Sequence, residues 1–303
     1  MSNLMNTVEQ NCDSADAPCS AIETILSPRV ANLGGFSVRR LLPTAKRKMV
    51  GPWVFFDEMG PAEFPAGQGL NVLPHPHIGI ATVTYLFEGE ILHRDSVGSY
   101  QPIRPGDINL MVAGSGIAHS ERERPEITAT DHRLHGLQLW LALPQEHEET
   151  APAFHHYPED DIPAVEIDGV PVRVMIGSAY GVTSPVLKFS ETLYLEATLK
   201  TGQTLALPQA PERAVYVASG ALRAHGSELP THSMTIFSRQ PDVAITATED
   251  TRIAVIGGEP LGKRFIEWNF VSSSKARIGT AREDWRAGRF EKVVGDEEAY
   301  IPY

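Results

Sequence analysis

Short runs of alternating apolar and polar residues, separated by Pro and Gly, fill the chain from Ser37 onward. Residues 51–58 and 81–87 are two examples, and the second is rich in the β-branched and aromatic side chains that are typical of strands. Helical periodicity is almost absent until residues 281–288, a short polar segment that ends at a glycine. The pattern therefore predicts an all-β fold with one short C-terminal helix.

A change of composition divides these strands into two groups. Residues 146–171 hold four prolines, an acidic run and little periodicity, which is typical of a connection between two units. Residues 1–27 are polar and poor in large apolar side chains, so we expect a flexible N-terminal tail there. We therefore predict an N-terminal unit over residues 28–150, a connection over 151–172 and a C-terminal unit over 173–303.

Two pairs of metal-capable side chains occur in the N-terminal unit. His75 and His77 form the first pair, and His119 and Glu121 form the second. Residues i and i+2 of a strand point to the same face, so two neighbouring strands would bring three imidazoles and one carboxylate into one cavity. Such a set leaves open positions on an octahedral ion, which suits Fe(II), Mn(II), Ni(II) or Cu(II) better than a closed structural zinc site. The alternative is that ordinary hydrogen bonds satisfy these histidines.

Four further polar side chains lie between or after these pairs: His93, Asp95, His132 and His135. Such groups can support a ligand imidazole by hydrogen bonding to its second ring nitrogen. We favour the simpler interpretation, in which they are ordinary polar residues of hairpins and strands.

A weak internal repeat relates the two units. Residues 85–89 and 216–220 match at an offset of 131, in the same hairpin context. At this offset the histidines of residues 75–77 fall on Ala206 and Pro208. The second unit therefore does not repeat the ligand set, and we expect one metal site in the chain.

The charge balance limits the partners. The chain has 26 Lys and Arg against 38 Asp and Glu, a formal charge of −12, which disfavours nucleic acids and anionic membranes. The N-terminus lacks the pattern of a signal peptide, and no apolar run reaches the roughly 18 residues of a membrane span. Cys12 and Cys19 lie in the polar N-terminal stretch, outside any periodic segment. We expect a soluble, cytoplasmic protein.

Several motifs, in a consistent order, resemble those of the pirin family of the cupin superfamily. They are residues 39–43, 55–58, 75–79, 85–89, 105–107, 113–121 and 257–261. The resemblance implies a bicupin, in which two antiparallel β-barrels of the jelly-roll type pack together. It also implies one mononuclear metal in the N-terminal barrel, held by His75, His77, His119 and Glu121, and a degenerate C-terminal barrel. Ile78 replaces the arginine that is more usual at this position, and we expect this change at the pocket entrance.

The first function that the resemblance implies is a metal-dependent dioxygenase, an oxidoreductase similar to the bacterial pirins that act as quercetin 2,3-dioxygenases (quercetinases). Its substrates would be O2 and a small aromatic molecule of the flavonol type. Its cofactor would be one divalent ion, Fe(II) first, with Mn, Ni, Co, Cu or Zn as alternatives. Glu121 would be a ligand and also the catalytic general base that accepts the flavonol hydroxyl proton. Four side chains suggest an apolar pocket lining: Phe55, Phe56, Leu73 and Leu110.

The alternative is a non-enzymatic, iron-responsive regulatory protein, as other pirins are described to be. The oxidation state of the metal would then change the surface that a protein partner binds. The formal charge of −12 disfavours DNA as that partner, so a transcription factor or a metabolic enzyme fits better. We favour the enzyme.

Overall fold

The computed structural model describes residues 21–33, 36–239 and 242–303. Its strands pair antiparallel into sheets, and one short helix lies near the C-terminus, which confirms the predicted fold class. Within the described residues, no helix is both long and apolar enough to cross a membrane. Residues 1–20, which hold Cys12, Cys19 and most of the predicted tail, lie outside the described part.

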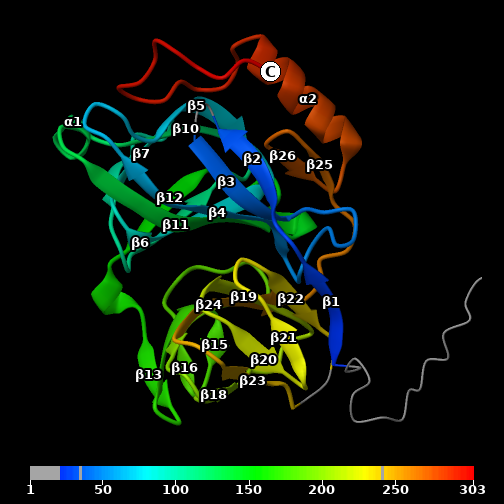
Figure 1. The fold of residues 1–303 in the computed structure, drawn as a ribbon. Coiled ribbons are helices and arrows are strands. Elements are labelled where there is room, and N and C mark those ends of the chain that lie inside the picture. Colours follow the sequence, from blue (N-terminus) through cyan, green and yellow to red (C-terminus); the bar gives the residue numbers. More distant parts are fainter. Residues whose placement is uncertain (1–20, 34–35, 240–241) are drawn as a thin grey trace, which may run out of the picture.

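The N-terminal unit contains two sheets (Figure 1). The larger has seven strands in the spatial order β12 (Ala153–Tyr157), β9 (Ile108–Val112), β6 (Ile80–Glu88), β11 (His132–Ala142), β4 (Trp53–Phe64), β3 (Phe36–Leu42) and β2 (Arg29–Leu33). The smaller has four, in the order β5 (Asn71–His77), β10 (Ile117–Arg122), β7 (Ile91–Asp95) and β8 (Tyr100–Ile103). A short helix α1 (Pro125–Thr128) and two 3-10 helices (Gln145–His147 and Glu159–Asp161) lie between strands.

The C-terminal unit is built in the same way. Its seven-stranded sheet has the order β1 (Ile22–Leu26), β22 (Met234–Phe237), β19 (Glu212–Ser219), β24 (Thr251–Gly258), β17 (Thr192–Leu199), β14 (Val170–Ile176) and β13 (Ala164–Ile167). Its four-stranded sheet has the order β18 (Thr204–Ala206), β23 (Ala244–Ala247), β20 (Leu222–Ala224) and β21 (Ser227–Leu229). A small hairpin is formed by β15 (Ser178–Ala179) and β16 (Val182–Thr183).

The equal strand order gives the weak sequence repeat a structural basis. Tyr85 lies on β6 and Tyr216 on β19, and each of these strands is third in its seven-stranded sheet. By the same offset, Ala206 on β18 falls at the position of His75 on β5. The C-terminal unit thus has no imidazole at this position, as predicted.

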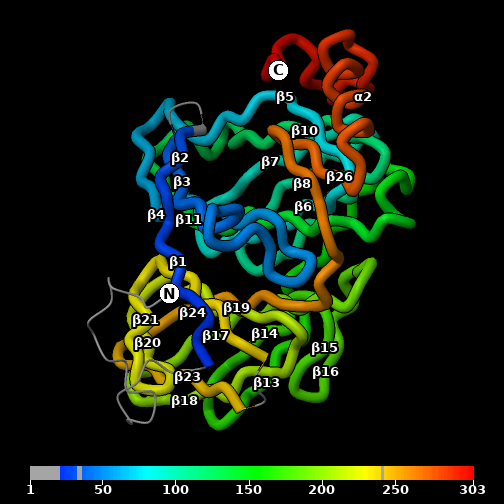
Figure 2. The backbone as a smooth tube through the Cα atoms, turned by 90° about the vertical axis from the view of Figure 1, so that its right-hand side faces the viewer, coloured from blue at the N-terminus to red at the C-terminus, as the bar shows by residue number. Residues whose placement is uncertain are grey.

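Edge strands of both large sheets come from outside the predicted units, and in the C-terminal sheet these include β13, which lies in the predicted connection. Strand β12, within the predicted connection, pairs with β9, and β1, within the predicted tail, pairs with β22 of the C-terminal unit. Figures 1 and 2 show β1 beside the C-terminal unit, although it is the first strand of the chain. The prediction of a flexible tail is therefore wrong for residues 22–26, because Leu26 packs in the core between the units and Ile22 and Ile25 pack against the interior of the C-terminal unit.

We expect Leu26→Ala to lower the free energy of unfolding by about 2 kcal/mol. This value is the lower end of the usual cost of truncating a buried leucine, and we choose it because β1 is an edge strand. Leu26 is 2% exposed and packs in the core between the units. Urea denaturation measures the change, and Glu23→Ala, at an exposed site on the same strand, is the matched control. Equal midpoints for both variants would mean that β1 adds nothing to the fold.

The two seven-stranded sheets pack face to face, and this contact forms the largest apolar core. Phe56 of β4 meets Tyr216 of β19 with ring centres 4.8 Å apart. The indole Nε1–H of Trp53 donates to the Leu193 carbonyl of the other unit, at 3.2 Å. Each four-stranded sheet lies on the outer side of its large sheet (Figure 1). Aliphatic side chains fill most of the interior of the C-terminal unit, which also buries Arg213, whereas the interior of the N-terminal unit holds several buried histidines.

The last part of the chain returns to the N-terminal unit. Strands β25 (Phe265–Glu267) and β26 (Phe270–Ser272) and helix α2 (Lys275–Arg286) lie over it in Figures 1 and 2. The helix predicted at residues 281–288 begins earlier, because the Ser274 hydroxyl caps it by accepting from the Arg277 N–H at 3.4 Å. It ends just before Gly288, whose φ of +67° suits a glycine after a helix.

Candidate metal centre

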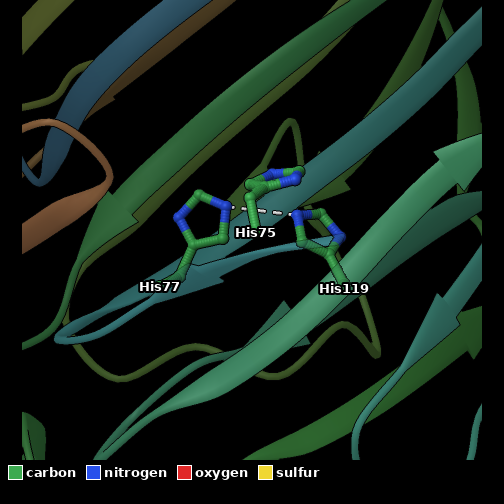
Figure 3. A group of neighbouring side chains, drawn as sticks. All are labelled: His75, His77 and His119. Atoms are coloured by element: carbon green, nitrogen blue, oxygen red, sulfur yellow. Dashed lines mark hydrogen bonds between the residues drawn. The ribbon is translucent and has the colours of Figure 1, made fainter. Parts of the chain in front are cut away.

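Strands β5 and β10 bring three histidines together in the interior of the N-terminal unit (Figure 3). His75 and His119 are direct partners across this antiparallel pair, and His77 lies two residues along the same face of β5. One ligand atom from each ring lies within 4.8 Å of the others, and all three side chains are buried. The predicted geometry of two neighbouring strands is therefore present for the three imidazoles.

Hydrogen bonds orient the histidine rings. His75 Nδ1 lies 2.8 Å from the Leu73 carbonyl, and His77 Nδ1 lies 3.2 Å from the Asn269 carbonyl. A carbonyl oxygen only accepts, so each of these Nδ1 atoms carries the hydrogen and donates it. The Nε2 atom of both rings is then left with a free lone pair, which is the form that binds a metal.

The spacing of the ring nitrogens and the protonation state of the rings both suit a bound cation. His77 Nε2 and His119 Nε2 are 3.1 Å apart, and two ligand atoms bound at right angles, each about 2.1 Å from one ion, would be about 3 Å apart. Burial lowers the pKa of His75 to about 4. Burial, with repulsion from the neighbouring imidazoles, lowers the pKa of His77 and His119 well below the usual value. The rings are thus neutral at neutral pH, and this donor set fits a divalent metal ion.

Glu121 is buried on β10, but the structure does not group it with the three imidazoles. Its Oε1 accepts a hydrogen bond from the Thr84 hydroxyl at 3.1 Å, and burial raises the pKa of its carboxyl group. Strand β10 pairs with β7 in regular register from His119 to Glu121, and the extra residue of the β5–β10 pair lies on β5. The role of Glu121 as a fourth ligand and base stays a prediction.

An aromatic wall lies beside the cluster. The Trp140 ring meets His77 edge-on, with ring centres 4.9 Å apart, and Phe55 stacks on Trp140 at 4.0 Å. Phe55 was predicted in the lining and lies on this side of the large sheet. Phe56 and Leu110, also predicted there, instead pack in the core between the units, because neighbouring residues of a strand point to opposite faces. Trp140 was missed, since its position in sequence carries no sign of the contact.

The hairpin of β25 and β26, called the C-terminal hairpin below, supports the site from outside the predicted N-terminal unit. Its Asn269 carbonyl accepts the His77 hydrogen bond, and Phe270 forms an isolated bridge with Ile78. Ile78 is 1% exposed and packs with Phe270 and Ile278. The expectation that Ile78 lies at a pocket entrance is therefore wrong, because the hairpin and helix α2 cover it.

We expect Gly79→Ala to destabilise the chain and weaken metal binding together. Gly79 has a φ of +67°, and a Cβ atom there would lie 2.0 Å from the Val271 carbonyl oxygen. The left-handed conformation alone costs an alanine about 1–2 kcal/mol, and the clash would displace the hairpin that orients His77. Thermal unfolding and metal titration measure the two effects. Gly67→Ala is the control for conformation alone, since its φ is +83° and nothing lies within 4 Å of the added Cβ.

The other predicted polar residues fall into two groups. His132 Nε2 pairs with Glu123 at 3.2 Å and His135 Nε2 pairs with Glu58 at 3.0 Å, so both make ordinary, partly buried polar contacts, as predicted. His93 is different, because its Nδ1 lies 3.4 Å from the Nδ1 of His119. This contact gives His93 the geometry of the alternative role, that of a hydrogen-bond partner to the second ring nitrogen of a candidate ligand.

Comparison with known proteins places these observations in a family. A model of the pirin family matches residues 35–141, and a model of the pirin C-terminal cupin domain matches residues 194–291. A pirin-like protein of Caulobacter vibrioides is 46% identical over 93% of this chain and 99% of its own length. A crystal structure of quercetin 2,3-dioxygenase from Acinetobacter baumannii has a TM-score of 0.86 at 34% identity, covering 92% of this chain and 94% of that one. A second from the same organism has a TM-score of 0.82 at 29% identity, covering 89% and 98%.

Proposed function

Because the chain belongs to the pirin family, we propose that it is a metal-dependent dioxygenase that opens flavonols of the quercetin type with O2. The observation that carries this proposal is the cluster of three buried, neutral imidazoles in the N-terminal unit. The two similar Acinetobacter baumannii proteins bear the name quercetin 2,3-dioxygenase, which supports the same substrate class.

In this proposal His75, His77 and His119 hold the ion, with Glu121 as the fourth ligand. The ion, when bound, supplies a Lewis acid for the flavonol 3-hydroxyl group and a centre for O2 chemistry. Fe(II) is our first choice, with Mn, Ni, Co, Cu or Zn as alternatives, because affinity alone does not select the metal at such a site.

The protein groups around the ion have separate tasks. Glu121 accepts the hydroxyl proton of the substrate as general base, and Thr84 holds its Oε1 atom in place. Trp140 and Phe55 form an apolar aromatic wall beside His77 that excludes water from this side of the site. The main-chain carbonyls of Leu73 and Asn269 keep two of the imidazoles in the ligating tautomer.

The test is O2-dependent loss of flavonol absorbance by protein loaded with one metal at a time. We expect turnover by the loaded wild type, and none by the metal-free protein or by His75→Ala. Turnover by His75→Ala at the wild-type rate, or absence of turnover with every metal, would overturn the proposal. Absence of turnover with every metal would favour the iron-responsive regulatory function. That function predicts that the Fe(II), Fe(III) and metal-free forms of the protein bind different protein partners in a pull-down.

A further inference from the structure

A chain of buried polar groups runs from strand β7 into the histidine cluster. In the β7–β10 pair, Asp95 is the register partner of His119, and His93 is the partner of Glu121. His93 Nδ1 lies 3.4 Å from His119 Nδ1, and His93 Nε2 lies 2.9 Å from Asp95 Oδ2. His93 is 2% exposed and Asp95 is 0% exposed. A carboxylate, an imidazole and a second imidazole therefore lie in series, shielded from water.

The hydrogen bonds of Asp95 fix the direction of this chain. Asp95 Oδ1 accepts from the backbone N–H groups of Val97 at 3.1 Å and Ser99 at 2.9 Å, which anchors the carboxylate in the turn after β7. An ionised carboxylate only accepts, so Nε2 of His93 carries the hydrogen. In the neutral ring Nδ1 of His93 is then an acceptor, and it receives the hydrogen of His119 Nδ1. The Nε2 lone pair of His119 is left free, on the side of His77.

The three imidazoles of the cluster thus differ in how they are held. Main-chain carbonyls, which no substitution removes, hold His75 and His77. A side chain holds His119, and the ring of that side chain is itself stacked on Phe154, with ring centres 4.3 Å apart and planes inclined by 18°. His93 is therefore a point at which a substitution can change the ligand geometry without touching a ligand.

We propose that His93, anchored by Asp95, is a positioning residue that holds His119 in its ligating tautomer and orientation and so sets the metal affinity of the site. The inference deepens the proposed function and rests on its metal site. Loss of such an outer hydrogen-bond partner typically costs about 10–100-fold in metal affinity. His93→Phe removes the acceptor for His119 and keeps an aromatic ring to stack on Phe154. His93→Gln keeps an oxygen that accepts the His119 hydrogen.

The experiment titrates Co(II) into the metal-free full chain against a competing chelator, and follows the visible d–d absorption of the bound ion. We expect His93→Phe to bind about 10–100-fold more weakly than wild type, with an altered spectrum, and His93→Gln to restore most of the affinity. If wild type and both variants bind equally, the inference is overturned while the metal site stands. If wild type itself binds no Co(II), the metal site and the inference fail together.

A measurement on the wild type alone does not depend on how the variants fold. In protein with 15N-labelled histidine loaded with Zn(II), ring nitrogen shifts report which nitrogen of each imidazole carries hydrogen. We expect His93 to carry its hydrogen on Nε2, and His119 to carry its hydrogen on Nδ1. A hydrogen on Nδ1 of His93 would overturn the inference, because that nitrogen could not then accept from His119.

Discussion

Replacing His77 by glutamine is expected to abolish metal binding and to leave the fold intact. His77 Nε2 lies 3.1 Å from His119 Nε2, so its loss removes one of three converging donors. Loss of an outer partner costs about 10–100-fold, so loss of a ligand itself should lower the affinity by more than about 100-fold. Glutamine is close in size and still donates a hydrogen bond to the Asn269 carbonyl, which limits damage to the packing. Elemental analysis and metal titration measure the binding, and thermal unfolding of the metal-free proteins measures the fold.

A matched histidine outside the cluster serves as the control for this substitution. His155 lies on β12, half-buried, and the structure places it opposite Leu110 rather than near the cluster. His155→Gln should therefore keep one equivalent of metal. Full occupancy in His77→Gln would contradict the site. A wild-type protein that unfolds on metal removal would indicate a structural ion instead of a reactive one.

The three imidazoles of the site were predictable because a strand repeats its faces every two residues. The spacing of His75 and His77 alone predicts a shared face, and the same applies to His119 and Glu121. What local spacing does not contain is the distance between side chains on neighbouring strands, and the Glu121 carboxylate lies outside the group that the three rings form. The structure therefore confirms the convergence of the rings and leaves Glu121 bonded to Thr84.

The groups that orient the rings were not predictable, because they come from distant parts of the chain. Asn269 is 192 residues from His77, and it acts through a main-chain carbonyl, which every residue type possesses. The same limit applied to β1, a strand of five residues directly after a polar stretch, whose strand partner comes from Met234 and its neighbours. Local patterns predicted the strands well, but contacts between the units appear only in three dimensions.

Glu58 illustrates such a contact between the units. It belongs to a motif that carries the family resemblance, yet the sequence does not indicate its task. The carboxylate is 0% exposed and accepts hydrogen bonds from Arg39 Nη1 at 3.1 Å, His135 Nε2 at 3.0 Å, His232 Nδ1 at 2.9 Å and the Tyr216 hydroxyl. His232 comes from the C-terminal unit, so this one carboxylate joins the two units.

We expect Glu58→Ala to lower the free energy of unfolding by about 3 kcal/mol, because removing one partner of a buried charged group leaves the others without an acceptor. This is the lower end of the usual range, since the Arg39 and His232 side chains are 36% and 29% exposed and water can partly replace the carboxylate. Urea denaturation measures the loss. Glu228→Ala is the control, because that carboxylate is 81% exposed and pairs with Arg223 at the surface, a contact worth about 0–1 kcal/mol. Equal losses in the two variants would show that Glu58 does not stabilise the joined units.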